Sequence, residues 1–71
     1  MHPKIKEANY ADPSDVTQAE TFLAELPAAC SESHGYASKD GTVNIRIICN
    51  GSSNSMNGLI SIKNGVVTKI Q

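Results

Sequence analysis

The apolar residues of this chain follow a helical period before Gly35 and a strand period after it. Before Gly35 the apolar spacing is three and four residues, as on one face of a helix. This stripe consists of Val16, Ala19, Leu23 and Leu26, with Phe22 beside it. From Thr42 to Cys49 the side chains alternate between two faces, as in a half-buried strand: Val43, Ile45, Ile47 and Cys49 face one way, and Asn44, Arg46 and Ile48 face the other. The order predicts an α+β fold, with one N-terminal amphipathic helix packed on a three- to four-stranded antiparallel meander.

The predicted helix has a clear beginning and a clear end. Asp12 is a good N-cap residue, and Pro13 suits the first helical position, where its missing N–H costs nothing. Asp15 then faces the positive end of the helix dipole. Pro27 disfavours helical backbone at the residue before it and ends or kinks the helix there. We therefore expect a helix over residues 13–26.

Turn signals divide the second half of the chain into strands. A short extended piece precedes Gly41, which supplies the positive φ of a turn. Asn64-Gly65 is the sequence of a type I′ hairpin turn between residues 59–63 and 66–70. Residues 50–57 are mainly polar, with Met56 as the exception, and predict a loop that is long for a hairpin.

The Asn-Gly turn fixes the register of the last hairpin. It pairs Lys63 with Val66 and Leu59 with Ile70, which divides the side chains between two faces. The face that suits the helix carries Ile60, Ile62, Val67 and Lys69. The other face still carries Leu59, Val66 and Ile70, and a helix on one side only leaves them exposed. The alternative is that strand twist or a bulge covers some of them.

The predicted core combines the helix stripe with the inward face of the sheet. Its members are Val16, Ala19, Phe22, Leu23, Leu26, Val43, Ile45, Ile47, Ile60, Ile62 and Val67. A core of few, mainly mid-sized side chains is marginal, because a chain this short buries only about 60% of its unfolded surface. Together with a last strand that is open at one edge, this predicts a homodimer.

Residues 1–11 show no apolar period. We expect them to form a flexible arm, or one short extended segment pinned by Tyr10, ahead of a single domain over residues 12–71.

The net charge of −1 conceals two unlike halves. Residues 7–38 hold six acids and no Lys or Arg, whereas residues 39–71 hold four bases and one acid. The small total gives no global electrostatic reason to bind nucleic acid. The acids of the helix, Glu20 and Glu25, form either a solvated face or a surface that engages a basic groove on another protein.

No group of residues predicts catalysis. Asp15, Glu20 and Glu25 are spaced by five residues, so no two carboxylates lie side by side for acid–base work. Cys30 and His34 are four apart but make only half of a zinc site, and no glycine-rich phosphate loop occurs. We therefore expect no enzyme activity, no cofactor and no metal site.

Two hypotheses for function follow. The leading one is a small non-catalytic protein-interaction module, a regulator or inhibitor of a larger assembly. Its contact residues are Glu20, Glu25, Leu59, Val66 and Ile70. The alternative is a nucleic-acid-binding domain that uses the basic face of the sheet. Its contact residues are Tyr36, Asn44, Arg46, Lys63 and Lys69.

The sequence also predicts a location. Residues 1–20 hold no apolar run of the ~7–15 residues that a secretion signal needs. No stretch approaches the ~18–20 apolar residues of a membrane span. We therefore expect a cytoplasmic protein without membrane contact, in which Cys30 and Cys49 stay reduced.

Overall fold

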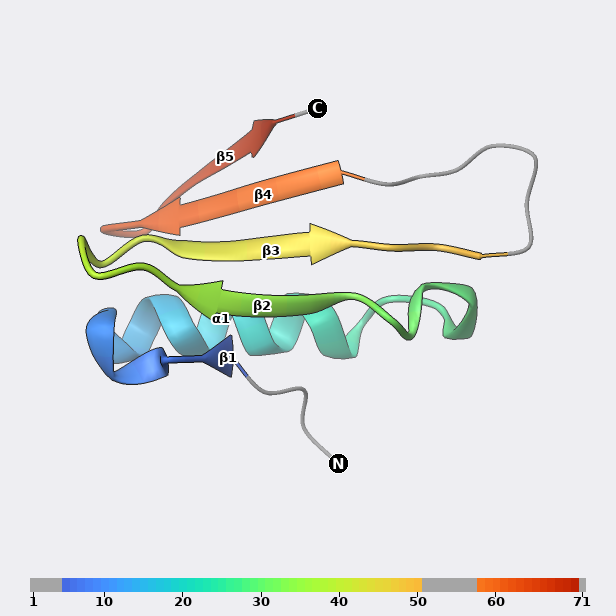
Figure 1. The fold of residues 1–71 in the computed structure, drawn as a ribbon, viewed down its shortest axis with the longest axis horizontal. Coiled ribbons are helices and arrows are strands. Elements are labelled where there is room, and N and C mark those ends of the chain that lie inside the picture. Colours follow the sequence, from blue (N-terminus) through green and yellow to red (C-terminus); the bar gives the residue numbers. More distant parts are fainter. Residues whose placement is uncertain (1–4, 51–57, 71) are drawn as a thin grey trace.

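The computed structural model describes residues 5–50 and 58–70, and in them one α-helix packs on a five-stranded sheet (Figure 1). The elements in chain order are β1 (Ile5–Lys6), the 3₁₀ turn η1 (Ala8–Tyr10), α1 (Pro13–Ala24), the 3₁₀ turn η2 (Ala28–Cys30), β2 (His34–Ala37), β3 (Val43–Ile47), β4 (Gly58–Lys63) and β5 (Val66–Ile70). The α+β class is confirmed. Most of the predicted loop, residues 51–57, lies outside the described residues.

The sheet is mixed, with its strands in chain order from β1 to β5. Strands β2 to β5 form the expected antiparallel meander. Strand β1 is parallel to β2, with Ile5 opposite Gly35. The prediction of three or four antiparallel strands was therefore wrong by this additional strand, because a strand of two residues shows no alternation in the sequence.

Strand β1 also changes the account of the predicted arm. Ile5 is only 6% exposed and belongs to the core, whereas Tyr10 is 40% exposed. A Cβ atom on Gly35 would lie 2.6 Å from Ile5 Cδ1 and 3.2 Å from the Asn44 carbonyl oxygen, so this close approach requires glycine. Residues 1–4 of the arm lie outside the described residues.

Helix α1 begins as the sequence predicts and ends slightly earlier. Asp12 Oδ1 accepts a hydrogen bond of 2.9 Å from the Ser14 N–H, and Pro13 occupies the first helical position. The helix ends at Ala24, two residues before the expected end at residue 26. Pro27 follows in extended backbone, which agrees with its role in stopping the helix.

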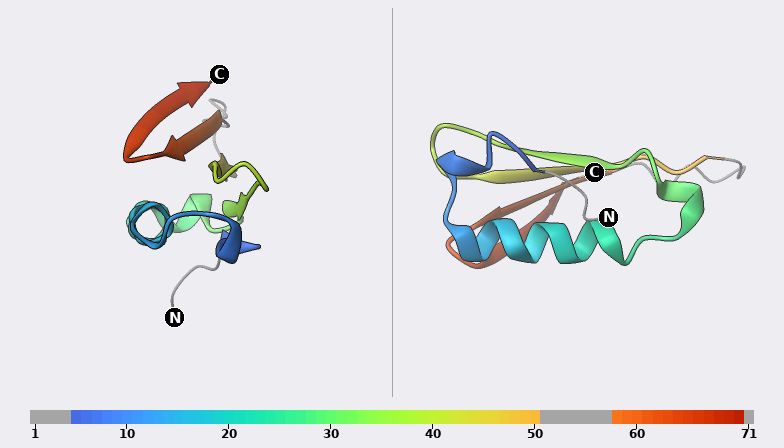
Figure 2. Two further views of the ribbon diagram at one scale, coloured as in Figure 1. Left: turned by 90° about the vertical axis from the view of Figure 1, so that its left-hand side faces the viewer. Right: turned by 90° about the horizontal axis from the view of Figure 1, so that it is seen from below.

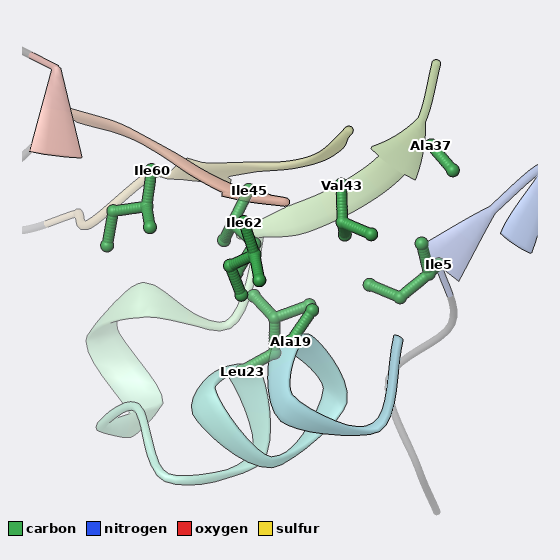
Figure 3. Packing of buried hydrophobic residues seen from close by; sticks show 8 residues of the cluster. All are labelled: Ile5, Ala19, Leu23, Ala37, Val43, Ile45, Ile60 and Ile62. Atoms are coloured by element: carbon green, nitrogen blue, oxygen red, sulfur yellow. The ribbon is translucent and has the colours of Figure 1, made fainter. Parts of the chain in front are cut away.

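The core lies between α1 and one face of the sheet (Figure 3). Its buried members are Ile5, Ala19, Leu23, Ala37, Val43, Ile45, Ile60 and Ile62. The predicted core residues Val16, Phe22, Leu26 and Ile47 are partly buried against this cluster. The prediction of Val67 was wrong, because this residue is 50% exposed. Helix α1 packs mainly on β3, and also on β1 and β4, so β5 at the edge lacks such a cover.

A buried carboxylate joins the helix to the sheet at one end of the molecule. Asp15 is 2% exposed, and its carboxylate accepts hydrogen bonds of 3.0 Å from the Asn64 N–H and 2.9 Å from the Gly65 N–H. Asn64 and Gly65 have φ of 51° and 78°, as a type I′ turn requires. Figure 2 shows that the sheet curls and brings this turn beside the start of α1.

At the opposite end of the molecule, the segment between α1 and β2 lies close to the chain that follows β3 (Figure 1), and a disulfide joins the two. It links Cys30 in η2 to Cys49, which follows β3. Two hydrogen bonds of 2.8 Å support it: the Asn50 N–H donates to the Ala29 carbonyl, and the Ile48 N–H donates to Ser33 Oγ. The prediction of two reduced cysteines was therefore wrong. The positions of the two cysteines in the sequence do not show that η2 lies beside the end of β3 in the fold.

Candidate interaction surfaces

Strand β5 gives the described part of the chain an apolar strand edge. It pairs with β4 on one side, and within the described residues no strand lies on its other side. Val66 is 64% exposed and Val67 is 50% exposed, the largest values among the exposed large hydrophobic residues. An unpaired strand edge that also carries exposed apolar side chains is a template for pairing with another chain.

The turn geometry fixes which backbone groups of β5 face outward. In a two-residue type I′ hairpin, the residues that flank the turn form a hydrogen-bonded pair, here Lys63 and Val66. Such pairs alternate along an antiparallel ladder with pairs whose N–H and C=O groups point away from each other. Val67 and Lys69 are therefore the residues of β5 whose backbone groups face away from β4.

The residues predicted to bind a protein lie on two surfaces rather than one. Glu20 is half-buried on α1, and Glu25 is exposed at its C-terminal end. Leu59 is half-buried and Val66 is exposed on the sheet face turned away from α1, because their neighbours in sequence face the helix. Ile70 pairs with Leu59 in the backbone ladder, and its side chain lies outside the described residues.

The sheet face away from α1 has a polar row at its centre. The row crosses all five strands through Lys6, Tyr36, Asn44, Ser61 and Thr68. Asn44 is buried, and its amide donates 3.0 Å to Ser38 Oγ and accepts 3.2 Å from Ser61 Oγ. Its polar groups are therefore engaged within the fold rather than offered to a nucleic acid.

The predicted nucleic-acid residues divide between both faces of the sheet. Tyr36, Arg46 and Lys63 share the face away from α1 and are exposed there. Lys6 joins them, which the sequence could not show because the pairing of β1 was not predicted. Lys69 pairs with Ile60 and therefore lies on the helix side. The basic face thus contains Lys6 in place of the predicted Lys69.

One acid lies close to this basic face. The backbone N–H of Thr42 donates to Asp40 Oδ1 at 2.9 Å and lowers the pKa of Asp40, and the charge of Lys63 lowers this pKa further. The charge of Lys63 is therefore partly offset by a carboxylate of the neighbouring turn.

The cysteine–histidine pair of the sequence does not form a metal site. Both cysteine sulfur atoms are in the disulfide, so Cys30 offers no thiolate beside His34. Over residues 5–50 and 58–70, no three or more His, Cys, Asp or Glu side chains gather where they could hold a metal ion. A shallow open hollow beside β1 is lined by Ile5, Lys6, Glu7, His34, Gly35 and Tyr36.

Comparison of the chain with protein-family models, with curated proteins and with solved structures finds no match in any of the three. Among the described residues, no helix has the length and apolar character needed to cross a membrane.

Proposed function

We propose that the protein is a small non-catalytic interaction module, a regulator or inhibitor of a larger protein assembly. The observation that carries this proposal is the free edge of β5, where Val66 is 64% and Val67 is 50% exposed. Another chain can add a strand to such an edge, since main-chain hydrogen bonds then supply affinity and neighbouring side chains supply specificity.

The helix supplies a second surface of different chemistry. Residues 7–38 carry six acids without a Lys or Arg. Of the four on or beside α1, Asp12 and Asp15 hydrogen-bond within the fold, which leaves Glu20 and Glu25 for this surface. Acidic groups without local counter-charges favour a partner with a basic surface and speed its association. We assign recognition of the partner to this acidic helix surface, Glu20 and Glu25, and assembly to the β5 edge.

Capture of a partner from a lysate of the source tests the acidic helix surface. The Glu20→Lys, Glu25→Lys double variant is expected to lose most of the captured protein, because it reverses both charges. The matched control is Glu32→Lys, which reverses an exposed acid in a turn outside α1. Equal capture by all three proteins would remove the acidic helix surface from the proposal.

Nucleic-acid binding is the second candidate, and the side chains of Lys6, Arg46 and Lys63, which share one face of the sheet with Tyr36, favour it. Tyr36 is 39% exposed, so its ring is open to stack on a base. A labelled single-stranded oligonucleotide tests this at low salt. Binding that weakens with salt and is lost in Arg46→Ala, Lys63→Ala supports the candidate. Absence of binding at low salt rejects it.

The cytoplasmic location stays a prediction, and the disulfide bears on it. Structural disulfides persist mainly in oxidising compartments and are rare in the cytoplasm. Rapid alkylation of thiols in the source cells, followed by mass spectrometry, decides the state of Cys30 and Cys49. Two alkylated cysteines would support a cytoplasmic location, and two protected ones would argue against it.

A further inference from the structure

We propose that the edge of β5 binds β5 of a second copy of this chain, antiparallel and about a two-fold axis through Thr68. The five strands of each copy then form one continuous sheet. This inference rests on the proposed role of the β5 edge and names its occupant.

The backbone of β5 offers the groups that such a pairing needs. Val67 and Lys69 direct their N–H and C=O groups away from β4, so these groups meet water in a single copy. With the axis at Thr68, Val67 of one copy lies opposite Lys69 of the other. Each of these two symmetry-related pairs exchanges two backbone hydrogen bonds. The N–H and C=O groups of Val67 and Lys69, which face away from β4, are then all hydrogen-bonded.

The other two-fold registers are less favourable. An axis at Val67 places Lys69 opposite Gly65, whose N–H already donates to Asp15 at 2.9 Å. An axis at Lys69 places the two lysine side chains directly opposite each other, and like charges in that position destabilise a sheet. The Thr68 register avoids both problems.

The side chains agree with the Thr68 register. On the helix side, Val67 of one copy lies next to Lys69 of the other, whose aliphatic stem covers apolar surface while its charge stays in water. On the other face, the two threonines lie side by side at the axis, a cross-strand pair that stabilises sheets. Val66 lies next to the Ile70 position of the second copy. Both exposed valines therefore gain neighbours.

The two edges of the sheet differ in a way that favours a closed dimer. The opposite edge strand, β1, has only two residues, so pairing of β5 with β1 of another copy would be short. Pairing of β5 with itself uses the longer strand and leaves no second long edge to continue a filament. The two-fold axis is perpendicular to the sheet, so both α1 helices lie on the same side. A dimer thus presents its two acidic helix surfaces together, which raises avidity for a repeated basic partner.

Sedimentation velocity over a wide concentration range tests the proposal with Val67→Pro. Proline at this position removes an N–H that faces away from β4, so the hairpin keeps its ladder. We expect the wild type to form a dimer and Val67→Pro to associate at least roughly tenfold more weakly. The control is Thr17→Ala, which changes an exposed residue of α1 away from the β5 edge and is expected to dimerise as the wild type does.

Cross-linking tests the register and does not depend on a proline variant that folds. Thr68→Cys places two thiols at the axis, where mild oxidation is expected to join the copies covalently. Val66→Cys is the matched control, since it lies opposite the Ile70 position and is expected to give little covalent dimer. Peptide mapping verifies that the Cys30–Cys49 bond is intact in both variants.

Two results would overturn the proposal: a wild type that stays monomeric at every concentration, or a dimer that Val67→Pro does not weaken and Thr68→Cys does not cross-link. Either result would remove the β5 edge from the proposed function. The acidic helix surface would remain, because capture through Glu20 and Glu25 is measured separately and does not require a dimer.

Discussion

The two ends of the molecule hold helix and sheet together by different chemistry. At the carboxylate end, Asp15 binds the β4–β5 turn at Asn64 and Gly65 through two hydrogen bonds. At the disulfide end, a covalent bond joins Cys30 and Cys49. The β4–β5 hairpin is therefore tied to the helix at this end by one buried side chain. The stability of the disulfide end depends instead on whether Cys30 and Cys49 are oxidised.

A buried carboxylate is costly unless its charge is compensated. Asp15 has three sources of compensation: the two N–H groups of the turn and the positive end of α1. Without this contact, the N–H groups of Asn64 and Gly65 would be hydrogen-bonded to water. The position of β5 is thus coupled to the start of the helix.

Removal of the disulfide is expected to have the largest effect on stability. The cross-link spans a sequence separation of 19 residues, and its loss in Cys30→Ser, Cys49→Ser should cost about 3 kcal/mol of unfolding free energy. Urea denaturation measures this cost. The wild type with reductant serves as the second measurement of the same change. A loss below about 1 kcal/mol in both would show that the disulfide end is held by its hydrogen bonds instead.

Asp15→Ala is expected to lower the free energy of unfolding by about 2 kcal/mol. The value is smaller than the sum of two charge-assisted bonds because Asn64 and Gly65 are exposed, so water replaces part of the contact. Asp15→Asn keeps one acceptor oxygen but places an NH2 donor opposite the second N–H, so it should retain at most one of the two hydrogen bonds. Hydrogen exchange should increase in β4 and β5 first. An equal increase of hydrogen exchange in η2 would show that Asp15 does not act on the carboxylate end alone.

Gly65→Ala is expected to cost about 1 kcal/mol, because Gly65 has φ of 78°, where alanine is strained. Its matched control is Gly58→Ala, since no atom lies within 4 Å of the added Cβ there. Thermal unfolding compares the two variants. If both lose the same stability, the turn conformation does not explain the carboxylate end.

Lowering the pH is expected to have the smallest effect on stability, because the carboxylates with a lowered pKa, Asp12 and Asp40, are exposed. Hydrogen bonds from Ser14 lower the pKa of Asp12, and those from Thr42 lower the pKa of Asp40, each from an ordinary value of 3.8. A lowered pKa in the folded state stabilises the fold above the ordinary value, and this stabilisation is lost as the pH falls through the folded pKa. Stability should therefore decline slightly below about pH 4. The Asp12→Ala, Asp40→Ala variant should show a smaller decline, and an unchanged decline would assign the effect to other groups.

The sequence predicted the parts of the fold that local chemistry determines. The Asp12-Pro13 start of α1 and the type I′ turn at Asn64-Gly65 have specific backbone requirements, and both are confirmed. The register of the last hairpin follows from that turn and agrees at every pair from Leu59–Ile70 to Lys63–Val66.

The parts that the sequence did not predict depend on contacts between distant residues. Asp15 was assigned to the helix dipole alone, and its bonds to a turn 49 and 50 residues away have no local signal. The two residues of β1 are too few to show a period, although Gly35 opposite Ile5 is the residue that admits them. Val67 has the right alternation for a core residue, but burial also requires a neighbour beyond the edge strand. The Cys30–Cys49 bond could not be predicted, because no local pattern shows that η2 lies beside the end of β3.

Amide exchange of β5, measured by NMR as a function of protein concentration, tests the role of the β5 edge most directly. The N–H groups of Val66 and Thr68 face β4 and should be protected at every concentration. The N–H groups of Val67 and Lys69 should exchange rapidly in dilute solution and become protected as the concentration rises. Rapid exchange of Val67 and Lys69 at every concentration would contradict the pairing of β5 with a second copy.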